Sequence, residues 1–129
     1  MNFQELIRIR RSIRAYRPAA LPDDVLHRVL DAGRVAPTAC NIQPFQLVVV
    51  TDPEVRGKLK AAYRHDWFCQ APAIVAGCVE PAKAWKRNDG FNAAEVDIAI
   101  VMDHIILAAT EEGLGTCWIG SFDEGKAKE

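Results

Sequence analysis

The chain has 129 residues, of which 50% are hydrophobic, and its 16 basic and 17 acidic residues give a formal net charge of −1. This length and hydrophobic content fit one domain with a buried core, over residues 1–129, and exclude a disordered chain. The charge balance argues against a dedicated nucleic-acid binder, which normally carries a basic excess.

A helix-like run from Phe3 to Ile7 opens the chain and is followed by the basic cluster Arg10-Arg11-Ser12-Ile13-Arg14. In an extended segment alternate side chains point the same way, so Arg10, Ser12 and Arg14 can converge on one object. Guanidinium forks and a hydroxyl together suit a phosphate dianion. A solvated basic loop and a nucleic-acid arm are the alternatives that the cluster alone leaves open.

Apolar residues at helical spacing predict an amphipathic helix from about Pro22 to Val35, which ends before Pro37. The loop that follows carries Thr38, Asn41 and Gln43 between two prolines. Its amide and hydroxyl groups offer donors and acceptors that suit the edge of a planar heterocycle. The alternative is that Thr38 and Asn41 only satisfy the backbone of a turn.

Two apolar, β-branched runs predict buried strands, Phe45 to Val50 and Ala73 to Val79, with a helix from Pro53 to Tyr63 between them. The longest helix is expected from about Asn92 to Glu112, ending at Gly113. Because this helix is apolar nearly all round, we expect it to be buried against the sheet or against another subunit. Acidic residues interrupt its apolar run, so we do not expect it to span a membrane.

The segment Gly115 to Gly120 predicts a short strand closed by a turn. Its glycines permit a ligand to approach the backbone closely, although helix capping and tight turns explain them as well. Taken together, the elements predict an α+β fold in which a sheet and helices pack around one dominant central helix.

The four cysteines and three histidines are scattered singly along the chain. No spacing is typical of zinc ligands, so we expect no metal site. The N-terminal residues lack the apolar core of a signal peptide, and we therefore expect a cytoplasmic protein in a reducing compartment.

Three segments in order resemble the nitroreductase family of FMN-dependent oxidoreductases. Arg10 to Arg14 looks like its phosphate-binding RRSxR motif, Ala36 to Phe45 is similar to its AP(S/T)xxNxQPW/F loop, and Ala108 to Gly120 resembles its LAAxxxGLGTCWIG segment. Each motif is weak singly, but their order and spacing agree over nearly the whole chain. The resemblance implies the family's α-β-α sandwich, with a mixed sheet around a long central helix.

The resemblance also implies a homodimer with FMN at the subunit interface. Arg10, Ser12 and Arg14 would hold the phosphate, with Arg11 contributing its main chain or side chain. The flavin ring would meet residues of the partner subunit's loop, namely Pro37, Thr38, Ala39, Asn41 and, more weakly, Gln43. The backbone of Ile119 and Gly120 would approach the flavin N5 region.

The chemistry implied is hydride transfer from NADH or NADPH through the flavin N5 to a small electron-poor acceptor such as a nitroaromatic or quinone. No side chain would act as a catalytic acid or nucleophile, because the cofactor carries the reaction. A non-catalytic FMN storage module is one alternative. A flavin-destructase or dehalogenase-type member of the same family is another.

The sequence departs from the family at its C-terminus. Members usually continue with a further strand and a basic segment that adds to the phosphate site, whereas this sequence ends at Glu129. We expect either a shortened member or a piece of a longer chain. In both cases the motifs are weaker grounds for expecting FMN binding and dimer formation than they would be in a full-length member of the family.

Overall fold

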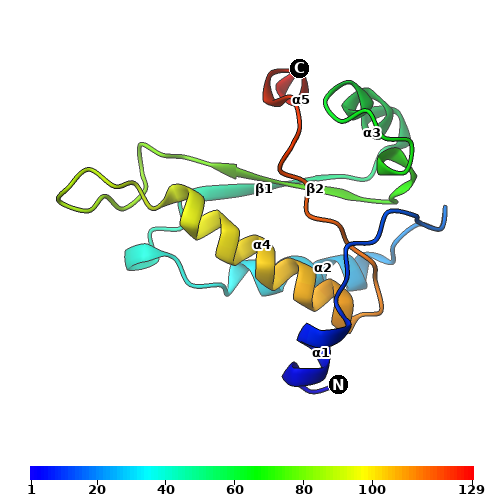
Figure 1. Ribbon diagram of the computed structural model, residues 1–129, viewed down its shortest axis with the longest axis horizontal. Helices are drawn as coiled ribbons and strands as arrows, with labels where there is room; N and C mark the ends of the chain where they lie inside the picture. Colours follow the sequence, from blue (N-terminus) through cyan, green and yellow to red (C-terminus); the bar gives the residue numbers. More distant parts are fainter.

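The computed structural model describes all residues from 1 to 129, and its elements follow one another as helices around a small sheet (Figure 1). The α-helices are α1 Phe3–Ile9, α2 Asp23–Arg34, α3 Pro53–Lys58, α4 Ala94–Glu111 and α5 Glu124–Lys128. The strands are β1 Phe45–Val50 and β2 Ile74–Val79. Three short 3₁₀ helices complete the set: η1 Ala39–Asn41, η2 Leu59–Ala61 and η3 Phe68–Gln70.

The sheet consists of β1 and β2, which run antiparallel with Phe45 opposite Val79 and Val50 opposite Ile74. Helices α4 and α2 lie on one face of the sheet, and α5 and α3 lie toward the other (Figure 1). This arrangement confirms the α+β class. Within the chain, the one parallel pairing is an isolated bridge between Ser12 and Thr116.

The core lies between α2, α4 and the sheet. Its centre is a cluster of five buried residues: Val29, Ala36, Val101, Ile105 and Ala109. Helices α2 and α4 approach closely because Gly33 has no side chain. A Cβ at Gly33 would lie 2.8 Å from two side-chain carbons of Ile105.

An ion-pair clamp holds the same two helices together at one end. The guanidinium of Arg28 donates to both carboxylate oxygens of Glu112, at 2.7 and 3.0 Å, and also to Asp24 at 2.8 Å. The hydrogen bond from Arg28 lowers the pKa of the Glu112 carboxyl. The clamp therefore fixes the C-terminal end of α4 against α2.

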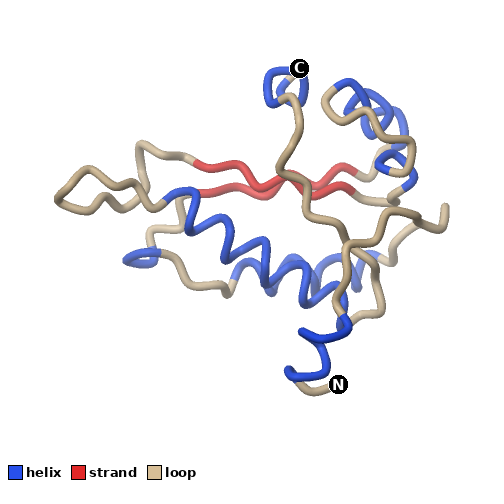
Figure 2. Tube along the Cα trace, in the orientation of Figure 1, coloured by secondary structure: helices blue, strands red, loops and turns tan.

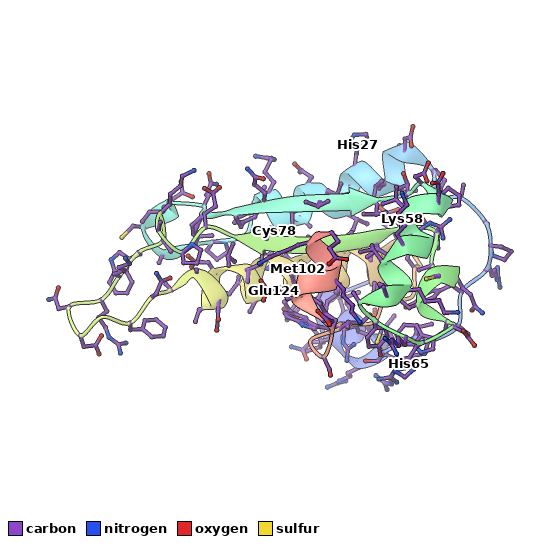
Figure 3. The ribbon with its side chains drawn as sticks, turned by 90° about the horizontal axis from the view of Figure 1, so that it is seen from above. His27, Lys58, His65, Cys78, Met102 and Glu124 are labelled. Carbon is purple, nitrogen blue, oxygen red and sulfur yellow. The ribbon has the colours of Figure 1, made fainter.

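The strands are less buried than the sequence predicts. Gln46 and Val48 of β1 are exposed, as are Ala76, Gly77 and Cys78 of β2. Viewed from above, α5 covers only part of the sheet beside Cys78 (Figure 3). The prediction of two fully buried strands is wrong, because one face of the sheet is largely open in this chain.

Two other predictions need correction. The helix expected from Pro53 to Tyr63 ends at Lys58 and continues as the 3₁₀ turn η2. The strand expected at Gly115 to Gly120 does not form, because only Thr116 finds a backbone partner. Figure 2 shows this segment as a loop that runs alongside the loop after α1.

Candidate functional site

The segment from Arg10 to Tyr16, here called the arm, follows α1 and carries the basic cluster. Asn2 and Glu5 form a capping box at the start of this helix, and Arg10 caps its end. Beyond Arg10 the backbone turns away and Ser12 pairs with Thr116, while the Ile13 N–H donates to the Thr116 carbonyl at 2.8 Å. The first and third motifs therefore lie side by side (Figure 1).

The contact between the arm and the third motif is tight because Gly115 lacks a side chain. A Cβ at this position would lie 2.9 Å from Cγ1 of Ile13. Ile13 therefore packs directly on the Gly115 backbone. Its neighbours Ser12 and Arg14 are exposed.

The arginines of the cluster differ in how they are used. The Arg11 guanidinium donates to the Arg10 carbonyl at 2.8 Å and to the Arg8 carbonyl, so this side chain satisfies the end of α1. Arg10 and Arg14 take part in none of the ion pairs within the chain. Two cations without a carboxylate partner flank Ser12, an arrangement that favours an anion.

Tyr16 anchors the far end of the arm. Its hydroxyl donates to the Ile13 carbonyl at 2.6 Å, and its ring packs 6.3 Å from the ring of Trp67. Burial, and then the nearby Cys117, raise the pKa of Tyr16 to about 12, although Arg14 acts to lower it. The arm is thus held in place at both Ser12 and Tyr16.

The second motif forms a compact loop with an unusual backbone. Cys40, Asn41 and Gln43 have φ angles of 53°, 51° and 56°, in the left-handed region that non-glycine residues rarely adopt. Each such residue costs on the order of 1–3 kcal/mol and persists only where its surroundings impose the conformation. Strain of this kind is typical of functional loops.

Specific hydrogen bonds impose the shape of this loop. The Gln43 N–H donates to Oγ1 of Thr38 at 3.1 Å, and the Ala39 N–H donates to Oδ1 of Asp97 at 2.9 Å. Pro44 is fully buried behind the loop. Pro37, Asn41 and Gln43 are exposed, while Thr38 and Ala39 are half-buried, so the loop presents a preformed polar tip.

Within one chain the second motif does not meet the other two. The loop at η1 lies near the N-terminal end of α4, whereas the arm and the third motif lie near its C-terminal end (Figure 1). Helix α4 has 18 residues, which span about 27 Å at the usual rise per residue. The sequence-predicted site residues therefore form two separate groups in this structure.

The third motif follows α4 at Gly113, whose φ of 77° ends the helix. Its segment then passes the arm and presents Trp118, which is 51% exposed. Ile119 is half-buried, and a Cβ at Gly120 would meet no atom within 4 Å. The backbone at Gly120 is therefore accessible to a ligand.

A polar hollow beside this motif was not predicted from the sequence. It has a volume of about 530 Å³, and its lining consists of Ala62, Tyr63, Arg64, His65, Ser121, Phe122 and Asp123. The Asp123 N–H donates to the Ala62 carbonyl at 2.9 Å and closes one side. Figure 3 labels His65 at this end of the molecule.

Aromatic rings gather next to the hollow. The ring of Tyr63 lies 4.5 Å from that of His65, 5.6 Å from that of Trp67 and 5.3 Å from that of Phe68. Tyr16 joins the cluster through Trp67. The sequence signal for this cluster is the density of aromatic residues after Ala62. From the sequence alone, Tyr63 is expected only as the last residue of a helix.

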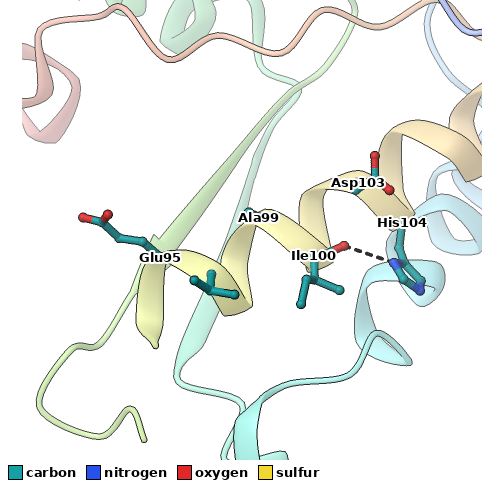
Figure 4. A pocket seen from close by; sticks show the side chains of 6 residues that line it. Glu95, Ala99, Ile100, Asp103 and His104 are labelled. Carbon is teal, nitrogen blue, oxygen red and sulfur yellow. Dashed lines mark hydrogen bonds between the residues drawn. The ribbon is translucent and has the colours of Figure 1, made fainter. Parts of the chain in front are cut away.

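A second, shallower hollow runs along α4 and has a volume of about 470 Å³ (Figure 4). Its lining consists of Glu95, Val96, Ala99, Ile100, Asp103 and His104. Nδ1 of His104 donates to the Ile100 carbonyl at 3.0 Å. This face of the long helix is open, in contrast to the face that packs on α2.

No group of histidine, cysteine, aspartate and glutamate side chains in the structure is arranged to hold a metal ion. None of the helices has the length and apolar character that crossing a membrane requires.

Known proteins with similar sequences carry names that agree with the motifs and the arrangement described above. A protein of Methanothermobacter thermautotrophicus, named as an NADH dehydrogenase/NAD(P)H nitroreductase, is 29% identical over 123 residues, which cover 95% of this chain and 62% of the relative. A protein of the same name from Archaeoglobus fulgidus is 30% identical, over 92% of this chain and 67% of the relative. The chain thus spans about two thirds of the length of these curated relatives.

Solved structures show the same fold. A nitroreductase family protein of Clostridium difficile 630 superposes with a TM-score of 0.92 at 37% identity, over 99% of this chain and 73% of that one. A nitroreductase of Desulfovibrio desulfuricans, solved in complex with FMN, superposes with a TM-score of 0.79 at 26% identity, over 94% and 70% of the two chains. A sequence profile of the nitroreductase family matches residues 7–67 and 59–129. With the motifs, the fold and this profile in agreement, the chain belongs to the nitroreductase family.

Proposed function

We propose that the chain is an FMN-dependent oxidoreductase that takes reducing equivalents from NADH or NADPH and passes them to a small electron-poor acceptor. The observation that carries this proposal is the junction of the arm with the segment after α4. There, Arg10 and Arg14 lack intrachain ion pairs, Ser12 lies between them, and the Gly120 backbone is open. Relatives named as NAD(P)H nitroreductases and a neighbour solved with FMN support it.

The residues of this junction fit an FMN phosphate. Unpaired guanidinium groups and an exposed hydroxyl supply charge-assisted donors for a dianion. Arg10, Ser12 and Arg14 would hold the phosphate. Arg11 would contribute through its main chain, because its side chain already donates to the carbonyls of Arg8 and Arg10.

The accessible backbone at Ile119 and Gly120 fits the edge of a flat ring system. A main-chain N–H there can donate to a ring nitrogen without a side chain in the way. FMN held by these residues would supply the redox chemistry, relaying reducing equivalents from NAD(P)H to the acceptor. The residues of the chain bind and orient the cofactor, and no side chain is assigned as acid, base or nucleophile.

We further propose that a homodimer completes the site. The loop with Pro37, Thr38, Ala39, Asn41 and Gln43 lies far from the arm in the same chain, so a second copy has to supply it. The open apolar face of α4 around Val96 and Ala99 provides a surface for that second copy. The location in a reducing cytoplasm stays a prediction from the sequence.

The visible absorption spectrum of the purified chain tests the proposal, before and after titration with FMN. We expect FMN to copurify or to bind with saturation, and the protein then to oxidise NADH or NADPH when a nitroaromatic or quinone is added. Bound flavin without turnover would indicate a storage module. Absence of saturable FMN binding would overturn the proposal.

A further inference from the structure

Asp97 is the one buried charged side chain of the molecule. It lies in the first turns of α4 and is 2% exposed, and the small apolar residues one turn before it, Ala93 and Ala94, are buried as well. An ionised carboxylate in such a place loses its hydration and is costly unless it is paired. Helix packing alone does not require a carboxylate here.

The carboxylate makes one contact, and that contact reaches another part of the chain. Oδ1 accepts a hydrogen bond from the Ala39 N–H at 2.9 Å, while Oδ2 is buried without a partner. The hydrogen bond joins α4 to the first residue of η1. The buried carboxylate is thus directed at the second motif.

This contact is the one hydrogen bond that joins the loop from Pro37 to Gln43 to a helix. Its other hydrogen bonds lie within the loop, such as the one from the Gln43 N–H to Oγ1 of Thr38 at 3.1 Å, or reach the start of β1, where the Phe45 N–H donates to the Gln43 carbonyl at 2.8 Å. These bonds shape the loop but do not fix it against a helix. The bond from Ala39 to Asp97 does, immediately before the left-handed residues Cys40 and Asn41.

We propose that Asp97 is a positioning residue for FMN binding, acting through the backbone of the Pro37–Gln43 loop. By holding the Ala39 N–H, it fixes the loop on the same helix whose open face is proposed to meet a second copy. The loop tip is then presented to the flavin as a rigid surface. This inference rests on the proposed function, because the loop acts on FMN only if FMN binds.

Three variants separate positioning from simple packing. Asp97→Ala removes the acceptor. Asp97→Asn keeps an Oδ1 acceptor and removes the charge. Val101→Ala is the matched control, because Val101 is 0% exposed on the same helix, lies near Gly33 and has an apolar side chain that makes no hydrogen bond to the loop.

Two measurements on the full chain read out the effect, namely hydrogen exchange of the loop amides without FMN and the dissociation constant of FMN. For Asp97→Ala we expect loop exchange to rise and FMN affinity to fall, each by about tenfold or more. Asp97→Asn should stay within about threefold of the parent, since it keeps the acceptor. Val101→Ala should lower the melting temperature while leaving loop exchange close to that of the parent.

If Asp97→Ala folds poorly, Ala39→Pro removes the same hydrogen bond from the loop side. Thr38 is extended, with φ −130° and ψ 157°, which suits a residue before proline, and the first position of a helix commonly accepts proline. The FMN affinity of Ala39→Pro should fall as well.

Unchanged loop exchange and unchanged FMN affinity in either variant would overturn the role of Asp97. If the unaltered chain itself bound no FMN, the proposed function would fail instead. Hydrogen exchange of the loop amides, measured without FMN, would then still decide whether Asp97 fixes the loop.

Discussion

The arginines outside the arm are mostly committed to partners within the chain. Arg28 pairs with Glu112 and Asp24, Arg34 with Asp31, and Arg87 with Asp89. Arg56 donates to the carbonyls of Cys69 and Ala71 at 2.9 and 2.5 Å. Arg10 and Arg14, in contrast, have no ion pair within the chain, and their guanidinium groups are free to meet a ligand.

A pair of matched variants tests whether the arm is a shaped phosphate site. Arg10→Ala should weaken FMN binding by about 1.5–3 kcal/mol, the usual contribution of a hydrogen bond to a charged group. Arg17→Ala removes the same charge from a residue beyond the cluster and should have a smaller effect. Equal losses, measured by FMN titration at one ionic strength, would indicate general basicity rather than a shaped site.

Tyr16 makes stability depend on pH in the alkaline range. Burial raises its pKa to about 12 in the folded chain, whereas an unfolded tyrosine ionises near pH 10. The neutral phenol therefore stabilises the fold fully below pH 10, and this contribution is lost as pH rises through about 12. Urea unfolding measured across this window should show falling stability.

Tyr16→Phe is the control for this pH dependence. It should unfold more easily by about 1 kcal/mol at neutral pH, because the hydrogen bond to the Ile13 carbonyl is lost. It should also lose less stability than the parent across the alkaline window. An identical alkaline loss in both proteins would assign the effect to groups other than Tyr16.

At the scale of elements, two glycines on helices should respond in opposite ways to alanine. A Cβ at Gly33 would lie 2.8 Å from Ile105 side-chain carbons, whereas a Cβ at Gly57 of α3 would meet nothing within 4 Å. Gly33→Ala should therefore destabilise the chain by about 1–3 kcal/mol through overpacking between α2 and α4. Gly57→Ala should be neutral or stabilise it by up to about 1 kcal/mol. Denaturant titration measures both, and a Gly33→Ala variant as stable as the parent would show that this contact relaxes.

The elements that the sequence predicts well are those with their own periodicity or caps. The helices at Phe3, Asp23 and Ala94 and both strands occur where expected, because apolar spacing and capping residues are local signals. The segment from Gly115 to Gly120 was wrongly predicted as a strand, because its pairing depends on Ser12 at the other end of the chain. Helix α5 was not expected, although Asp123 caps it by accepting from the Lys126 N–H at 3.0 Å.

The candidate site shows the same division between local and distant signals. The three motifs were found from residue types and order, and the contact between the first and third is a finding of the structure. The role of Asp97 was not predicted, because its partner Ala39 lies far away in sequence and the link is a backbone N–H, which carries no residue-type signal. The hollow at Tyr63 and Phe122 likewise joins distant segments.

At the scale of the whole molecule, the chain buries little of itself. Only 12 of its 129 residues are buried, although 50% are hydrophobic. On α4 the buried residues are Ala94, Asp97, Val101, Ile105 and Ala109, which form one stripe, and Val96 on the open side is 48% exposed. An apolar helix face of this kind typically marks an interface.

Val96→Glu tests the proposed dimer interface without disturbing the core. The new charge should shift the chain from dimer toward monomer at micromolar concentration and weaken FMN binding with it, because burying a carboxylate in an apolar interface is costly. Val55→Glu places the same charge on α3, where Val55 is 43% exposed, and should change neither property. Sedimentation velocity measures the oligomeric state, and a monomeric parent chain would contradict the dimer.

The bridge between Ser12 and Thr116 also bears on when the site forms. It joins residues near opposite ends of the chain, so closing it carries the entropy of a very long loop. Contacts of this kind form late in folding, after the local helices are in place. During synthesis the arm is made before Thr116 and has to wait for it. Its arginines are thus the earliest residues of the candidate site to be made and among the last to be ordered.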